Sequence, residues 1–105
     1  MSKRITDTIK VNVDALGNKY ILRLFVTGIS PNSVRAIKNI NAICEQYLKG
    51  RYELEIIDIY KFPSLAITED IIAVPLLIKK FPLPHDRMIG DLSNTEKVLK
   101  LLNLA

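Results

Sequence analysis

Few side chains in this sequence of 105 residues could carry out chemistry. The chain has one cysteine, Cys44, and one histidine, His85. A single cysteine cannot form an internal disulfide, a CxxC redox pair or a zinc site of several cysteines, so dithiol chemistry is excluded. Cys44 falls on the apolar face of a predicted helix, where a buried and unreactive thiol is expected. With one histidine besides, we expect neither a metal nor a cofactor.

The charged residues predict no nucleic-acid or membrane partner. The chain has 15 Lys and Arg against 11 Asp and Glu, a formal net charge of +4. The basic residues are scattered from Lys3 to Lys100 and interleaved with acids, without a basic tract. No apolar run reaches the roughly 18 residues of a membrane span, and the polar start is not a signal peptide. We therefore expect a reduced, cytoplasmic domain.

The length predicts one domain. We expect residues 1–19 to be an N-terminal extension and residues 20–105 to form a single domain. The extension contains one alternating stretch, Ile9, Val11 and Val13, before the turn signal Leu16-Gly17-Asn18. Because alternation is typical of a strand, the extension either adds an edge strand or remains mobile.

The first half of the domain predicts a strand, a helix and a second strand. Residues 20–27 (YILRLFVT) and 52–60 (YELEIIDIY) have strand composition, and a right-handed crossover makes them parallel. The helix between them has Ser30 as its N-cap, Pro31 at its first position and Gly50 as its stop. Its apolar residues recur at helical spacing: Val34, Ile37, Ile40, Ile43, Cys44, Tyr47 and Leu48.

The second half predicts a short helix over 64–72, strands over 76–80 and 87–90, and a last helix. The last helix begins with a capping box in which Ser93 and Glu96 each satisfy backbone donors. Nothing in the sequence after it breaks the helical spacing, so we expect this helix to run to the end of the chain. The predicted order of elements is β-α-β-α-β-β-α.

This is the order of the thioredoxin-like fold, an α/β architecture with a mixed sheet and helices on both faces. Val74-Pro75 directly precedes the third strand, where thioredoxin-like proteins carry a cis-proline, and we expect the bond before Pro75 to be cis. In a redox thioredoxin the first helix opens with CxxC, but residues 28–33 contain no sulfur. The pattern therefore indicates a thioredoxin fold without the thioredoxin reaction.

Four segments closely resemble the KaiB family. They are residues 20–28 (YILRLFVTG), residues 30–38 (SPNSVRAIK), residues 63–66 (PSLA) with Pro75, and residues 89–94 (IGDLSN). The resemblance implies a binding protein of circadian timing whose partner is the ring-forming ATPase KaiC. It also implies two packings of one sequence, a ground state that forms tetramers and a thioredoxin-like state that binds KaiC.

The same resemblance implies which residues meet a partner and which set the fold. The partner-binding candidates are Arg35, Lys38, Lys61 and Asp70. Clock members of the family carry glycine where this chain has Leu101, and glycine costs a helix interior about 1 kcal/mol relative to Ala. Leu101 therefore predicts one continuous final helix and a bias toward the thioredoxin-like state.

Two acidic residues also depart from the family's pattern. Clock members carry a lysine in place of Asp70, on the surface that meets KaiC, and an arginine in place of Asp86. A charge reversal at a complementary interface can cost several kcal/mol, so Asp70 weakens the expectation of KaiC binding.

Three hypotheses about function follow. The first is a non-catalytic KaiB-type regulatory protein that binds a KaiC-like ring ATPase and forms dimers or tetramers. The second keeps the family but not KaiC: an adaptor in stress response or two-component signalling, on a histidine kinase pathway. The third is a cysteine-free thioredoxin-fold enzyme that binds glutathione with Ser30, Ser33 and Pro75, although Ser30 already has a role as N-cap.

Overall fold

The computed structural model describes residues 19–71 and 73–105; the predictions made for residues 1–18 lie outside the described residues. Within that range the predicted order of strands and helices is confirmed. The elements are β1 (Tyr20–Val26), α3 (Pro31–Tyr47), β2 (Tyr52–Asp58), α4 (Pro63–Thr68), β3 (Leu76–Phe81), β4 (Asp86–Ile89) and α5 (Thr95–Leu101).

The four strands form one mixed sheet in the order β2-β1-β3-β4. Strand β1 runs parallel to β2, with Tyr20 beside Tyr52 and Val26 beside Asp58. It runs antiparallel to β3, which in turn pairs antiparallel with β4. The parallel pair follows from the long crossover through α3, whereas the short turn between β3 and β4 requires antiparallel strands.

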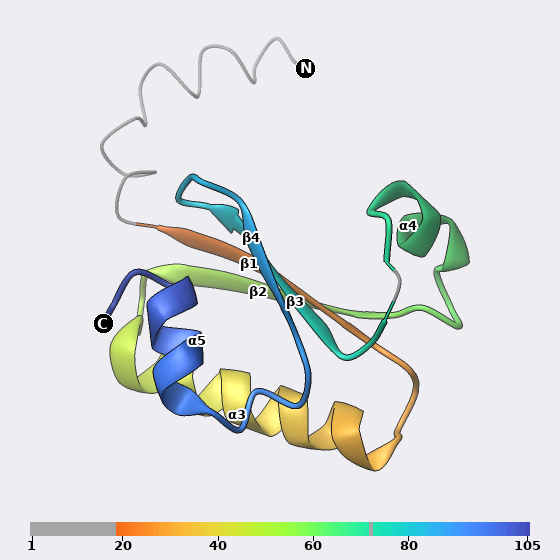
Figure 1. The fold of residues 1–105 in the computed structure, drawn as a ribbon, viewed down its shortest axis with the longest axis horizontal. Helices are drawn as coiled ribbons and strands as arrows, with labels where there is room; N and C mark the ends of the chain where they lie inside the picture. Colours follow the sequence, from red (N-terminus) through yellow and green to blue (C-terminus); the bar gives the residue numbers. More distant parts are fainter. Residues whose placement is uncertain (1–18, 72) are drawn as a thin grey trace, which may run out of the picture.

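Helices cover both faces of the sheet, as the thioredoxin-like order predicts (Figure 1). Helices α3 and α5 lie together on one face, where they bury the side of β1 that carries Leu22 and Leu24. On the other face, Phe25 and Ile78 form a smaller core against which Leu65 of α4 packs. Strand β1 is buried on both faces because it lies inside the sheet between these two layers.

Helix α3 has the predicted start and most of the predicted buried face: Ile40, Ile43, Cys44 and Leu48 are buried. Ser30 is the N-cap, its hydroxyl accepting from the Ser33 N–H at 3.3 Å, and Pro31 is the first helical residue. The predicted apolar face is wrong at Val34 and Tyr47, which are exposed. The first two turns instead bury Ser33 and Ala36, because these positions, and not Val34, lie on the side of the helix that meets the sheet.

The predicted capping box at Ser93 and Glu96 is wrong by one residue. Helix α5 starts at Thr95, and the N-cap is Asn94, whose side-chain oxygen accepts from the Lys97 N–H at 3.1 Å. The Ser93 N–H donates to Asp91 in the preceding loop. Asparagine caps helices as well as serine does, so the two starts compete in the sequence.

Helix α5 is continuous but does not run to the end of the chain. It ends at Leu101, which is buried. Asn103 then adopts a left-handed φ of 63° and donates to the Lys100 carbonyl, while the Leu104 N–H donates to the Leu99 carbonyl. This pair of bonds is a Schellman cap, and asparagine tolerates the left-handed position it needs. The effect of Leu101 on the balance of fold states stays a prediction.

Helix α4 is also shorter than predicted, ending at Thr68 and not at residue 72. Asp70 adopts a left-handed φ of 58°, which turns the chain out of the helix.

A buried hydrogen bond joins the first strand to the last helix. The Tyr20 hydroxyl donates to the carbonyl of Leu102, the C-cap of α5, at 2.7 Å. Replacing Tyr20 by phenylalanine should lower the free energy of unfolding by about 1 kcal/mol, because a buried hydrogen bond is lost without a change of shape. Urea denaturation measures the effect. The matched variant Tyr47→Phe, at an exposed position, should leave stability unchanged.

The position of the α5 cap can be tested with two alanine variants. Asn94→Ala should lower the free energy of unfolding by about 1 kcal/mol, the usual cost of an N-cap. Ser93→Ala should cost less, because it leaves the Asn94 cap and the Ser93 N–H bond to Asp91 in place and removes only the hydroxyl contact with Asp91. A larger loss in Ser93→Ala than in Asn94→Ala, measured by thermal unfolding, would contradict this cap.

Candidate protein-interaction surface

Helix α4 and the loop between β1 and α3 lie at one end of the sheet (Figure 1), and several large apolar side chains of this region are exposed. Ile67 of α4 is 81% exposed, and Ile29 in the loop between β1 and α3 is 91% exposed. Tyr60 and Phe62, between β2 and α4, also face solvent. These loops follow the carboxyl ends of the parallel strands β1 and β2, so they meet at one end of the sheet. Exposed apolar groups gathered in one region are typical of protein-binding surfaces.

Helix α4 presents part of this surface although its own sequence holds it weakly. It has six residues, none of them fully buried, and Phe62 at its N-cap makes no side-chain capping bond. Isolated helices of this length are unstable in water. Contacts with the sheet must therefore fix its position.

An ionic network at the carboxyl side of α4 provides such contacts. The Glu69 carboxylate lies 2.9 Å from Nη1 of Arg23 on β1 and 2.8 Å from Nζ of Lys80 on β3. Only 14% of the Glu69 side chain is exposed, so solvent screens these pairs less than surface pairs. Arg23 also contacts Glu55 of β2 at 3.0 Å. The network thus joins the end of α4 to three strands.

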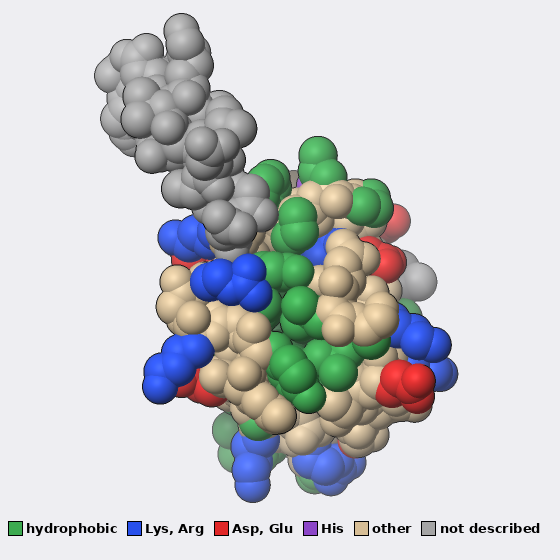
Figure 2. All heavy atoms as spheres, turned by 90° about the vertical axis from the view of Figure 1, so that its left-hand side faces the viewer, with side chains coloured by type: hydrophobic (Ala, Val, Ile, Leu, Met, Phe, Trp, Pro, Cys, Tyr) green, Lys and Arg blue, Asp and Glu red, His purple; other side chains and the backbone are tan. Residues whose placement is uncertain are grey.

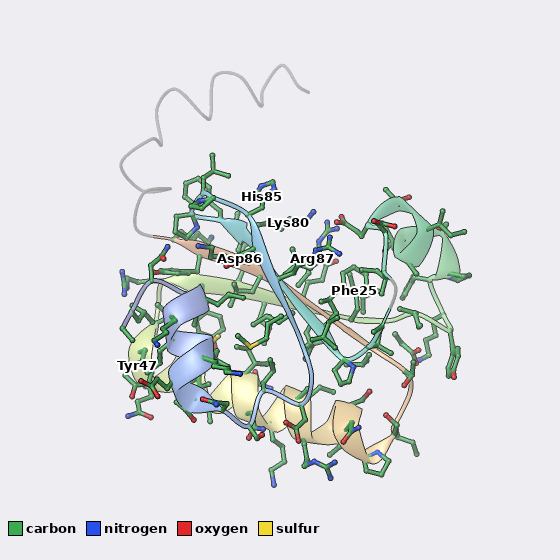
Figure 3. The ribbon with its side chains drawn as sticks, viewed as in Figure 1. Phe25, Tyr47, Lys80, His85, Asp86 and Arg87 are labelled. Atoms are coloured by element: carbon green, nitrogen blue, oxygen red, sulfur yellow. The ribbon has the colours of Figure 1, made fainter. Side chains whose placement is uncertain are left out.

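Arg87 of β4 holds the backbone of Glu69 and Asp70, directly after α4. Its guanidinium donates to the main-chain carbonyl of Glu69 at 3.0 Å and to that of Asp70 at 3.4 Å. Figure 3 places Arg87 and Lys80 on the side of the sheet that faces α4. The turn at Asp70 is therefore held by its backbone, and the exposed Asp70 carboxylate is left to solvent.

The surrounding cations keep Glu69 ionised. The hydrogen bond from Lys80, with the charges of Lys80, Arg23 and Arg87, lowers the pKa of the Glu69 carboxyl from its ordinary value. A lowered pKa means that the ionised carboxylate is more stable in the folded protein than in the unfolded chain.

The structure places the four predicted partner-binding residues in two separate regions. Lys61 and Asp70 flank α4, while Arg35 and Lys38 are exposed on α3, which covers the other face of the sheet. Arg35 is engaged within the fold: its Nε donates to the Asp91 carboxylate at 3.1 Å and its Nη2 to Asn32.

The loop between β4 and α5 is held against α3 by polar contacts. Besides Arg35, Asn39 of α3 donates to the Asp91 carbonyl at 2.8 Å. Hydrogen bonds from Ser93 and then from Arg35 lower the pKa of the Asp91 carboxyl. Leu92 has a left-handed φ of 63° and a buried side chain. Arg35 thus positions this loop, a structural role that the sequence alone did not indicate.

The hydroxyls at the start of α3 are used in local structure. Ser33 is buried, and its Oγ accepts from the Thr27 N–H at 3.1 Å. The Ser30 hydroxyl donates to Ser33 Oγ at 2.9 Å. The Val74–Pro75 peptide bond is cis. Burial, and then the charge of Glu45, raises the pKa of the Cys44 thiol to about 12, so this thiol stays protonated at neutral pH.

Within residues 19–71 and 73–105, no group of three or more metal-binding side chains is found, and no helix is long and apolar enough to cross a membrane. The surface has open hollows, and Figure 2 shows hydrophobic side chains gathered between basic side chains on the face that lies at the left in Figure 1. One of about 290 Å³ lies between β4 and α5, with Met88 and Leu101 among its lining residues.

Sequence reasoning missed two parts of this surface. The charges of Arg23 and Glu55 alternate with apolar residues in their strands, which was a signal that they share a solvent-facing side. The pairing of Arg23 with Glu69 could not be foreseen, because it depends on the register of β1 with β3 and on where α4 ends. The exposure of Ile67 likewise depends on which side of α4 meets the sheet.

The sequence comparisons give one family. The family model described as the KaiB domain matches residues 23–104. The circadian clock oscillator protein KaiB of Thermostichus vulcanus is 52% identical over 89 residues, which cover 85% of this chain and 82% of that protein. The protein of the same description from Synechococcus elongatus is 52% identical over 85 residues, covering 81% and 83%.

The solved structures most relevant to the fold are thioredoxin-like. The germline-specific thioredoxin Deadhead of Drosophila melanogaster superposes with a TM-score of 0.67 at 13% identity, covering 93% of this chain and 91% of that chain. The N-terminal domain of Synechococcus elongatus SasA has a TM-score of 0.60 at 26% identity, covering 84% and 87%. The first of these likenesses concerns the fold alone.

The ionic network of Glu69 makes the free energy of unfolding depend on pH. Because the pKa of Glu69 is lowered on folding, its contribution is present above the ordinary value of 4.5 and is lost as the pH falls below it. Glu69→Gln should therefore be less stable than the parent at pH 7 and should lose less stability between pH 6 and pH 3. Urea denaturation at each pH measures this. Glu96→Gln, a matched change on α5, is the control for the removal of one negative charge at pH 7.

Proposed function

Since the chain belongs to the KaiB family, we propose that it is a non-catalytic regulatory protein of biological timing that binds a KaiC-like ring ATPase. Its work is done by a surface, not by a reactive side chain. We further propose that it acts in the cytoplasm and assembles with copies of itself.

One observation carries this proposal: the exposed apolar surface at the α4 end of the sheet. Ile67 turns outward from α4, and Tyr60 and Phe62 lead into the helix. Burying such side chains against a partner is favourable, at roughly 25 cal/mol for each Å² of apolar surface. Lys61 and Asp70 add one charge of each sign beside them.

The ionic network supports a role in binding because it holds this surface in one shape. Glu69, Arg23 and Lys80 fix the end of α4 on the sheet. A surface that is already ordered loses less conformational entropy when a partner binds. We therefore place the KaiC-like partner on α4 and its flanks. Arg35 is given no direct contact with the partner, since it is engaged with Asp91.

The chemical groups of the chain support a protein without catalysis. The Cys44 thiol is buried with a pKa of about 12. The hydroxyls of Ser30 and Ser33 are engaged in the cap of α3. The glutathione-binding alternative would need one of these hydroxyls free at the mouth of a site, so no specific observation favours it.

A second candidate function is an adaptor in two-component signalling that does not bind KaiC. One observation favours it: Asp70 carries a negative charge on the surface assigned to the partner. The binding experiment below separates the two candidates.

Replacing Ile67 by glutamate should weaken binding to a clock KaiC at least tenfold, a loss of about 1.4 kcal/mol. A charged carboxylate would have to be buried where an apolar side chain was, which is unfavourable. Pull-down at low salt followed by titration measures the affinity. Leu83→Glu is the matched control, because Leu83 is also an exposed aliphatic residue, 65% exposed, but lies in the turn between β3 and β4. This variant should bind KaiC as the parent does.

Asp70→Lys is the second arm of the same titration. If Asp70 lies at the contact and opposes the partner's charge, the reversal should increase the affinity for a clock KaiC by about tenfold or more. Two results would sink the proposal. One is the absence of binding by the parent and by Asp70→Lys. The other is an equal loss of affinity in Ile67→Glu and Leu83→Glu, which would mean that the partner does not contact α4.

A further inference from the structure

Strand β4 forms one edge of the sheet, and part of its outer backbone has no partner. The Gly90 N–H donates to the Pro75 carbonyl at 2.9 Å, so the backbone groups of Gly90 point toward β3. Because these groups alternate in direction along an antiparallel strand, those of Arg87 and Ile89 point away from the sheet. Among the described residues, the Arg87 N–H bonds to the Asp86 carboxylate, but no partner is found for the Arg87 carbonyl or for either group of Ile89.

A groove runs between this edge and α5. One hollow of about 290 Å³ has Met88 and Leu101 in its lining, together with Lys97 and Lys100 of α5. A second of about 260 Å³ shares Met88 and Lys97 with it and continues along the loop that follows β4. Helix α5 lies on the left of Figure 1, and the view from that side shows hydrophobic side chains between basic ones (Figure 2). Each hollow is smaller than the roughly 300 Å³ at which small-molecule pockets begin, so it suits a single side chain of a protein partner.

The charges along the groove favour an acidic partner. Lys97 and Lys100 are exposed, and neither forms an ion pair with a carboxylate of the described residues. Of the acidic residues that line the groove, Asp91 is paired with Arg35, and Asp86 accepts from a backbone N–H. Two free ammonium groups therefore face the partner against at most one carboxylate, and complementary charge is what selects a partner for such a surface.

We propose that this groove binds an extended, acidic segment of another protein, which adds a strand to the edge of β4. An apolar side chain of the segment enters the hollow beside Met88 and Leu101. Carboxylates two residues to either side of it meet Lys97 and Lys100. Residues two apart point to the same face of a strand, so one segment can make both contacts. Strand addition takes its affinity from main-chain hydrogen bonds and its specificity from such side-chain pockets.

The groove lies on a different face of the sheet from the surface proposed for the KaiC-like ATPase. Met88 and Leu101 pack with the main core, on the side of α3 and α5, whereas α4 covers the opposite face. The inference therefore does not rest on KaiC binding. Two variants separate the two proposals: Lys97→Glu should bind a clock KaiC as the parent does, and Ile67→Glu should bind the acidic segment as the parent does.

Titration of the full chain with a blocked seven-residue peptide, TETLTET, tests the proposal by NMR chemical shifts. Its leucine can fill the hollow, and its glutamates can meet the two lysines. TKTLTKT reverses the charges and TETSTET lacks the apolar side chain, so each should bind at least about tenfold more weakly. No binding of TETLTET at about 1 mM, or equal affinity for all three peptides, overturns the proposal.

A charge reversal in the protein assigns the binding to this groove. Lys97→Glu should weaken TETLTET at least about fivefold and strengthen TKTLTKT by a similar factor. The α5 cap stays in place, because the bond to Asn94 uses the backbone N–H of Lys97. Lys49→Glu is the matched control, since Lys49 is also an exposed lysine but lies directly after α3. Equal losses in the two variants would mean that the peptide binds elsewhere, which overturns the proposed site.

Hydrogen exchange tests the added strand itself. At saturating TETLTET the outward amide of Ile89 should exchange at least about tenfold more slowly than in the free protein, because it gains a hydrogen bond. The amide of Leu54 is the internal control. It points outward at the opposite edge of the sheet, because the Ile59 N–H donates to Val26 and directions alternate along β2. Unchanged exchange at Ile89, or equal slowing at Leu54, overturns strand addition at β4.

Discussion

The need to cover both faces of β1 is the constraint on which the rest of this structure depends. Leu22 and Leu24 point to one side of the sheet and Phe25 to the other, and all three are fully buried. A strand that is apolar on both faces is stable only between two layers. Helices α3 and α5 supply the first layer, and α4 with the smaller core supplies the second. The bond from Tyr20 to Leu102 then joins the first strand to the end of the last helix.

The two layers are held by different physical means. On the α3 side, seventeen helical residues with a capped start bury a continuous apolar stripe. On the α4 side a short helix lacks a side-chain cap, and charged contacts of Glu69 with Arg23 and Lys80 hold its end. Because these charged contacts help to hold α4 on the sheet, Ile67 can face outward while Leu65 packs against the smaller core. This division explains how a small domain keeps a stable core and an exposed apolar surface at the same time.

The scaffold also explains why a thioredoxin-like fold can serve binding. At the start of α3, where a redox thioredoxin has its cysteines, this chain has serine hydroxyls that cap the helix. Its one thiol lies deeper on the buried face. The surface left for function is therefore made of loops at the ends of β1 and β2, of α4, and of the edge of β4 beside α5.

The sequence by itself determined the order of elements, the thioredoxin-like class, the family and the start of α3 at Ser30, because periodicity and capping are local properties of a chain. Only the tertiary structure decided the rest. Asn94, and not Ser93, is the N-cap of α5, because Ser93 lies in the preceding loop, where its N–H donates to Asp91. Arg35 of α3 forms an ion pair with the same aspartate. Glu69 became the centre of an ionic network because strand register brought Arg23 and Lys80 to it, and register depends on contacts between residues far apart in the chain.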